Sequence, residues 1–161
     1  MNEPFAYLYH YACLLVEARP TGQRGTIIEK IPLLLYVEDE ALIAVAVTEA
    51  LQEAGFEVQH VHNGREAADA LRERALQYQA LVTDVRLPLV DGWELARLAR
   101  ELNPSMPVVY VSGDSAAEWS AHGVPNSLML QKPFAMAQIV AAVTTLLNQA
   151  ASSPPPSAPN D

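Results

Sequence analysis

Five polar residues that can take part in phosphoryl-transfer chemistry lie at or just after the ends of short apolar runs. They are two acidic neighbours, a third carboxylate, a hydroxyl and an ammonium group: Glu38, Asp39, Asp84, Ser112 and Lys132. Three carboxylates that converge repel one another, and each raises the pKa of the others unless a cation compensates. Mg²⁺ suits this role because it prefers carboxylates, a carbonyl and water, and it shares its shell with phosphoryl oxygens. The residue types therefore point to Mg²⁺-dependent phosphoryl transfer with Asp84 as nucleophile.

Each of these residues also has an ordinary structural explanation when it is taken alone. The run Glu38-Asp39-Glu40 is typical of a solvated helix start, where carboxylates favour the positive end of the helix dipole. An aspartate such as Asp84 at the end of a strand is often a turn or N-cap residue, and Ser112-Gly113 alone is a turn. The order of the set along the chain, after the first, third, fourth and fifth apolar runs, favours a site.

The elements that would position these residues alternate between strand-sized and helix-sized segments. The expected strands are the continuous apolar run Leu33–Val37 and the further strand-sized runs Glu57–Val61, Ala80–Thr83, Pro107–Ser112 and Ser127–Leu130. The expected helices are Ala41–Ala54, Arg65–Gln77, Gly92–Leu102, Ala116–Ala121 and Ala135–Gln149. Apolar runs without alternation indicate strands covered on both faces, so the pattern predicts an α/β fold with a doubly wound, five-stranded parallel sheet. Ligands of such sheets bind at the carboxyl ends of the strands.

The domain organisation follows from composition. Residues 1–32 are expected to form an N-terminal extension, a loop or a loosely packed helix, and residues 33–149 a single domain. Residues 150–161 are rich in Pro and Ser and are expected to form a disordered tail.

Charge and hydropathy exclude several classes of function. The 161 residues carry a net charge of −9, which disfavours direct binding to nucleic acid or to an anionic membrane. The apolar run Phe5–Val16 is too short to cross a bilayer, and the stretch before it, with Glu3 and no Lys or Arg, disfavours a signal peptide. The single cysteine, Cys13, cannot form an internal disulfide. These features predict a cytoplasmic protein.

Four segments resemble the receiver domain of two-component response regulators. They are Leu34 to Glu40, Leu81 to Pro88 with Asp91-Gly92, Val109 to Gly113, and Leu130 to Phe134. The resemblance covers about Leu33 to Gln149. It implies a flavodoxin-like (β-α)5 fold with strand order 2-1-3-4-5, and a phosphoacceptor signalling module rather than an enzyme.

The resemblance also implies a role for each site residue. Asp84 matches the phosphoacceptor, Ser112 the switch hydroxyl and Lys132 the cation that pairs with the phosphoryl group. The Mg²⁺ ligands would be Asp39, Asp84, the backbone carbonyl of Arg86, and Glu38 through water. In this family the peptide bond before the matching proline is cis, which predicts a cis Lys132–Pro133 bond.

One position departs from the pattern of the family. Where the family often has a Tyr or Phe that swings inward on phosphorylation, this chain has Met129. A flexible thioether can fill the same space but has no ring. Tyr110 is an alternative switch residue, although a tyrosine in a buried strand is more often part of the core.

Two helices carry apolar faces. In the first, the core stripe is expected at Ile43, Ala46, Val47, Ala50 and Ala54, whereas Leu42 and Val45 face outward. This outward pair either docks a histidine kinase or a histidine phosphotransfer protein, or is ordinary surface. In the last helix, the core stripe is expected at Met136, Ile139, Val140, Val143, Leu146 and Leu147.

The output is expected to lie in a partner, because only 12 residues follow Gln149. A stand-alone receiver would act by docking to another protein or by phosphorelay. Trp119 and His122 lie near the face that the family uses for output partners. Trp119 is either part of that face or a half-exposed core residue.

Two other functions fit parts of the sequence. A haloacid-dehalogenase-like phosphatase also uses an aspartate nucleophile and Mg²⁺, but that family has a second Asp where this chain has Arg86. A scaffold with the receiver fold and no phosphorylation is disfavoured by the intact set of five site residues.

Overall fold

The structure, a computed structural model, describes residues 30–152 and contains one parallel sheet. Its strands are β1 (Leu33–Val37), β2 (Glu57–Val61), β3 (Ala80–Asp84), β4 (Val108–Ser112) and β5 (Leu128–Gln131). Their order across the sheet is β2-β1-β3-β4-β5, and every neighbouring pair is parallel. The predicted fold class and strand order are confirmed.

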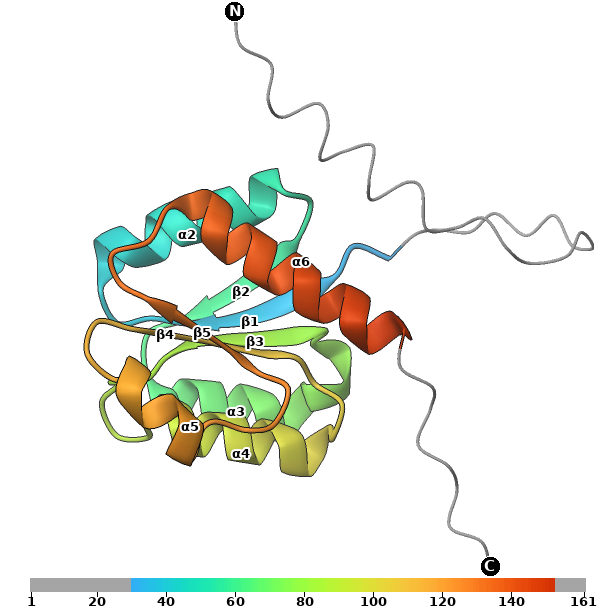
Figure 1. Cartoon of the computed structure of the whole chain (residues 1–161). Helices are drawn as coiled ribbons and strands as arrows, with labels where there is room; N and C mark the ends of the chain where they lie inside the picture. The colour runs from blue at the N-terminus through green and yellow to red at the C-terminus, as the bar shows by residue number, and fades with distance from the viewer. Residues whose placement is uncertain (1–29, 153–161) are drawn as a thin grey trace, which may run out of the picture. The chain divides into compact units, whose positions relative to one another are not determined.

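Helices cover both faces of this sheet (Figure 1). They are α2 (Ala41–Glu53), α3 (Gly64–Arg74), α4 (Gly92–Leu102), α5 (Trp119–His122) and α6 (Met136–Ser152), with short 3₁₀ turns at Ala75–Gln77 and Ala116–Glu118. Helices α2 and α6 lie on one face, and α3, α4 and α5 lie on the other. No helix within residues 30–152 is long and apolar enough to cross a membrane.

The core is divided by the sheet into two apolar clusters. Side chains of β1 alternate between them, so that Leu34 and Tyr36 pack with α2 and α6, whereas Leu35 and Val37 pack toward α3 and α4. Strands β3 and β4 are buried along their whole length. Burial on both faces explains why these strands read as continuous apolar runs.

Helices α3 and α4 begin at asparagine and aspartate caps. Asn63 Oδ1 accepts the backbone N–H of Glu66 at 3.0 Å, and Asp91 Oδ1 accepts that of Glu94 at 2.8 Å. A side-chain oxygen that accepts an otherwise unpaired amide stabilises the first turn of a helix. The cap at Asp91 also fixes the start of α4 beside the carboxyl end of β3.

The expected core stripe of α2 is partly wrong. The buried residues are Ala44, Val47 and Leu51, whereas Ala54 is exposed at the C-cap. The helix ends at Glu53 because Gly55 adopts a positive φ of 91°, which turns the chain away. Leu42 and Val45 face outward, as predicted.

The last helix differs from its expected limits. It extends three residues beyond Gln149, to Ser152, and Met136 at its start is exposed. The other expected core positions of this helix are buried or half-buried. Residues 1–29 and 153–161, which hold Cys13, the run Phe5–Val16 and most of the expected tail, lie outside the described residues.

Candidate functional site

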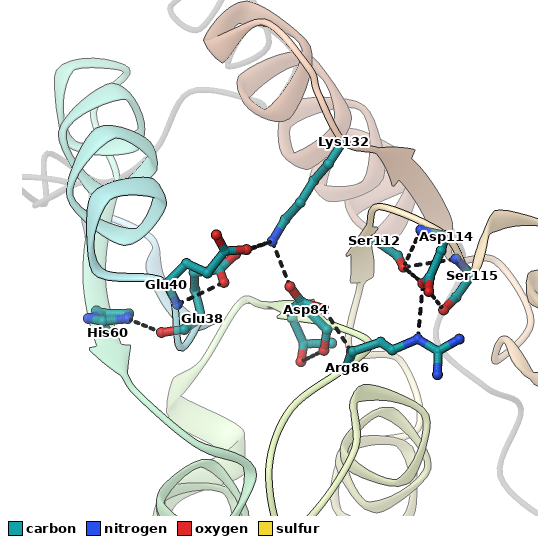
Figure 2. A network of polar contacts seen from close by, with 10 residues as sticks. Glu38, Glu40, His60, Asp84, Arg86, Ser112, Asp114, Ser115 and Lys132 are labelled. Atoms are coloured by element: carbon teal, nitrogen blue, oxygen red, sulfur yellow. Dashed lines mark hydrogen bonds and ion pairs between the residues drawn. The ribbon is translucent and has the colours of Figure 1, made fainter.

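The carboxyl ends of four strands bring the candidate site residues to one edge of the sheet. Glu38 and Asp39 follow β1, Asp84 ends β3, Ser112 ends β4 and Lys132 follows β5. Figure 2 shows Lys132 reaching down between Glu38 and Asp84, with Ser112 to one side of Asp84. The parallel sheet therefore collects the predicted residues because each lies at the same end of its strand.

Three carboxylates form a compact acidic cluster within the described residues. Ligand oxygens of Glu38, Asp39 and Asp84 all lie within 4.8 Å of one another. Glu38 and Asp84 are buried, whereas Asp39 is exposed. Two carboxylates that lose their water and a third at the surface make a half-open site, which suits a hard cation that keeps some of its waters.

Lys132 compensates the charge of this cluster. Its Nζ donates to Asp84 Oδ2 at 2.6 Å, lies 2.9 Å from Glu38 Oε2, and reaches Glu40 Oε1 at 3.3 Å. Although burial lowers the pKa of Lys132, its contacts with Asp84 and Glu38 outweigh this and hold the pKa above the ordinary value. The ammonium therefore stays charged. The Lys132–Pro133 peptide bond is cis, as predicted.

Both carboxylate oxygens of Glu38 have a partner. Its Oε1 accepts the backbone N–H of Glu40 at 3.1 Å, and its buried Oε2 lies 2.9 Å from the Lys132 ammonium in an ion pair. Burial raises the pKa of Glu38, and the Lys132 ammonium opposes this increase. Three carboxylates whose oxygens lie within 4.8 Å of one another, with a single lysine between them, are a donor set that suits Mg²⁺.

The backbone around Asp84 holds its carboxylate in place. Asp84 Oδ1 accepts the backbone N–H of Arg86 at 2.7 Å, and Thr83 Oγ1 donates to the Asp84 carbonyl at 2.8 Å. Gly92 at the start of α4 packs directly on that carbonyl. The carboxylate of Asp84 is thus oriented by the loop after β3. The role of the Arg86 carbonyl as a metal ligand stays a prediction.

Ser112 occupies the predicted position, but its hydroxyl bonds elsewhere. Its Oγ accepts the backbone N–H of Ser115 at 3.0 Å and lies 3.3 Å from Asp114 Oδ1. Asp114 in turn pairs with the side chain of Arg86 at 3.0 Å. Sequence reasoning missed Asp114, although its place two residues after Ser112 put it within reach of that hydroxyl.

Two further contacts near the acidic cluster were not predicted. Glu40 forms an ion pair with Lys132, and the only sequence signal for this contact was its place in the Glu38–Glu40 run. His60, on the neighbouring strand β2, bonds through Nε2 to the carbonyl of Glu38 at 2.9 Å. The pairing of Tyr36 with His60 in the β1–β2 register explains this contact, because it sets His60 two positions from Glu38.

The proposed switch tyrosine is a core residue in this structure. Tyr110 is fully buried, its ring lies 4.6 Å from that of Trp93, and its hydroxyl accepts the backbone N–H of Val124 at 3.2 Å. Met129, beside Tyr110 in the sheet, is half-buried. Trp119 is also half-buried against the core, and its indole N–H donates to Ser127 Oγ at 3.0 Å.

The fold and site define a receiver domain. The family model for the response regulator receiver domain matches residues 34–144, so the chain belongs to this family. The match includes every predicted site residue, from Glu38 to Lys132.

Individual relatives differ in how much of their length the chain covers. It is 34% identical over 121 residues to the transcriptional regulatory protein CusR of Escherichia coli, a match that covers 74% of this chain and 52% of CusR. The chain thus spans about half the length of that relative. It is 30% identical over 116 residues to the response regulator receiver protein CpdR of Brucella abortus, which covers 71% of this chain and 95% of CpdR.

Solved structures show the same fold. A response regulator receiver protein from Sinorhizobium medicae superposes with a TM-score of 0.73 at 42% identity, covering 75% of this chain and 98% of that one. The receiver domain of the sensor histidine kinase PA1611 from Pseudomonas aeruginosa superposes with a TM-score of 0.65 at 22% identity, covering 74% and 99%. The PA1611 structure has a magnesium ion coordinated in its active site cleft.

Proposed function

We propose that this chain is a response regulator that receives a phosphoryl group on Asp84 from a histidine kinase or a histidine phosphotransfer protein. The observation that carries the proposal is the meeting of Glu38, Asp39 and Asp84 within 4.8 Å at a sheet edge that Lys132 also reaches. Phosphoryl transfer depends chiefly on positioning and on neutralising charge. The cluster supplies a nucleophile, and the lysine supplies a cation beside it.

The transfer balances as a simple displacement. A carboxylate oxygen of Asp84 forms the bond to phosphorus while the P–N bond of the donor phosphohistidine breaks. The electron pair of that bond stays on the imidazole nitrogen, which takes up a proton. Lys132, which already touches Asp84 Oδ2, would remain beside the new phosphoryl oxygens and offset their charge.

Mg²⁺ is the cofactor that the donor set fits. Asp39, Asp84 and the backbone carbonyl of Arg86 would bind it directly, and Glu38 would bind through water. The convergence of the three carboxylates within 4.8 Å supports this assignment, as does the magnesium ion in the cleft of the PA1611 receiver domain. When bound, the ion supplies charge neutralisation for the carboxylates and the transferring group.

The surface beside this site offers a place for the donor protein. Leu42 is 89% exposed and Val45 57% exposed on the outer side of α2, which begins directly after the acidic run. Exposed apolar side chains are preferred contacts at protein interfaces. Docking there would present a phosphohistidine to Asp84, and the output would pass to a partner by docking or by phosphorelay.

A mass measurement tests the proposed function. The protein is incubated with Mg²⁺ and a small acyl phosphate, and the intact mass is recorded at intervals. We expect one added phosphate on the wild type and none on Asp84→Asn, whereas Asp69→Asn, which changes an exposed carboxylate on α3, should still be phosphorylated. An unmodified wild type would favour a non-phosphorylated scaffold. Sustained multiple-turnover hydrolysis of phosphoesters would favour a phosphatase.

A further inference from the structure

The hydroxyl of Ser112 is fully engaged by the loop that follows β4. Its oxygen accepts the backbone N–H groups of Ser115 at 3.0 Å and of Asp114 at 3.3 Å. The hydroxyl proton is directed to Asp114 Oδ1 at 3.3 Å. In Figure 2 the hydroxyl points toward Asp114 and Ser115, and the dashed lines from it lead to these two residues. A serine bound in this way has no donor to offer at Asp84.

Asp114 is itself held in position by charge. Its Oδ1 accepts Arg86 Nε at 3.0 Å and Ser115 Oγ at 2.9 Å, in addition to the contact with Ser112. The ion pair with the Arg86 guanidinium makes Asp114 a charged acceptor. An ionised acceptor forms a stronger hydrogen bond than a neutral one. The strength of the hydrogen bond that Ser112 donates therefore depends on the charged carboxylate of Asp114.

Arg86 connects this arrangement with the phosphoacceptor. Its side chain pairs with Asp114 and reaches Glu118 at 3.7 Å, while its backbone N–H donates to Asp84 Oδ1 at 2.7 Å. One residue thus joins the carboxylate of Asp84 to the carboxylate that binds Ser112 (Figure 2). The loop after β3 and the loop after β4 are fastened together beside the site.

We propose that Asp114 is a positioning residue that holds the Ser112 hydroxyl away from Asp84 in the unphosphorylated protein, with Arg86 fixing Asp114 in place. This proposal rests on the proposed function. A phosphoryl group on Asp84 would present a new, highly charged acceptor, and Ser112 can donate its single proton to one acceptor at a time. Asp114 therefore competes with the phosphoryl group for the Ser112 proton. The strength of the hydrogen bond from Ser112 to Asp114 sets how readily Ser112 turns to the phosphoryl group.

The test measures binding of a phosphoryl analogue, trifluoroberyllate, to the full chain at saturating Mg²⁺. Removing the competing acceptor with Asp114→Ala should lower the apparent Kd about fivefold, which is the size of one hydrogen bond. Asp114→Asn keeps an oxygen that can accept from Ser112 but loses the negative charge, so its Kd should lie between those of the wild type and Asp114→Ala. The matched control is Asp69→Ala, which removes another exposed carboxylate paired with an arginine at 3.3 Å and should leave the Kd unchanged.

A double-mutant cycle separates the proposed role from a general effect on the loop. In the Ser112→Ala background the hydroxyl is gone, so Asp114→Ala should have no further effect on the Kd. An equal effect in both backgrounds, or weaker binding by Asp114→Ala, would overturn the proposal. If trifluoroberyllate binding required Asp84 but its Kd were unchanged by Asp114→Ala, only this proposal would be overturned. Absence of binding to the wild type would overturn the proposed function as well.

Discussion

Lys132 Nζ lies 2.6 Å from Asp84 Oδ2, so the chain places a cation of its own on the carboxylate that is proposed to accept the phosphoryl group. The lysine is largely buried and also contacts Glu38, which is fully buried. An uncompensated charge at such a position is strongly destabilising. Lys132 is therefore a stabilising residue of the resting protein as well as a proposed participant in the chemistry.

Lys132→Met should destabilise the protein by about 2 to 4 kcal/mol in the absence of divalent cations, because it leaves buried carboxylates unpaired. Urea denaturation with a chelator present measures this change. Saturating Mg²⁺ should recover part of the loss by replacing the missing positive charge. The control is Arg72→Met, which breaks an exposed pair with Asp69 on α3 and should cost less than about 0.5 kcal/mol. Equal losses in both variants would contradict this role for Lys132.

The destabilisation by Lys132→Met should also depend on pH. Burial already raises the pKa of Glu38 above its ordinary value of 4.5, and the variant loses the ammonium that opposes this increase. The folded state of the variant then binds more protons than the unfolded state, so its stability falls as the pH rises from 4.5 through the raised pKa. Denaturation at pH 5 and pH 8 should show the smaller deficit at pH 5. A deficit independent of pH would exclude Glu38 as its source.

Asp39→Asn should weaken Mg²⁺ binding at least tenfold, since even residues that merely support a metal ligand cost tenfold or more when changed. Calorimetric titration with Mg²⁺ measures the affinity. Glu40→Gln removes one negative charge at the next residue, outside the acidic cluster, and is the matched control. Asp39→Asn and Glu40→Gln would weaken binding equally if only the overall charge mattered.

The fold was predictable because burial on both faces of β1, β3 and β4 produced uninterrupted apolar runs. Strand limits agreed with the structure to within one residue at each end. The meeting of Glu38, Asp84 and Lys132 was predictable for a related reason, because the carboxyl ends of parallel strands share one edge.

The hydrogen-bond partner of Ser112 and the buried face of α2 were not predictable from the sequence. The hydroxyl of Ser112 can donate to Asp84 or to Asp114, and only the loop conformation after β4 decides between them. In α2, the small side chains of Ala44, Ala46 and Ala50 carry little information about which face is buried. Only the packed helix shows that Ala44 is buried, together with Leu51.

Leu89→Gly should stabilise the protein by about 0.5 to 1 kcal/mol. Leu89 lies at the centre of a three-residue turn closed by Val90 N–H to the Pro88 carbonyl at 3.0 Å, and its φ of 74° is strained for a residue with a side chain. The side chain is 78% exposed, so its loss sacrifices little burial. Leu89→Ala keeps the strain and should change stability little. If Leu89→Ala raised the melting temperature as much as Leu89→Gly, backbone strain at Leu89 would not explain the stabilisation.

Gly92→Ala should lower stability by about 1 to 3 kcal/mol and slow phosphorylation of Asp84 by the acyl phosphate. A Cβ at this position would collide with the Asp84 carbonyl and lie 2.9 Å from Val85 Cα, so α4 has to move away from the end of β3. That movement would disturb the bond from Gly92 N–H to the Val85 carbonyl, now 2.9 Å, and with it the loop that orients Asp84. Gly113→Ala is the control, because a Cβ there meets nothing within 4 Å and its φ is not in the left-handed region. Similar losses in the two variants, measured by urea denaturation and by intact mass, would show that contact with Asp84 is not the reason for glycine at position 92.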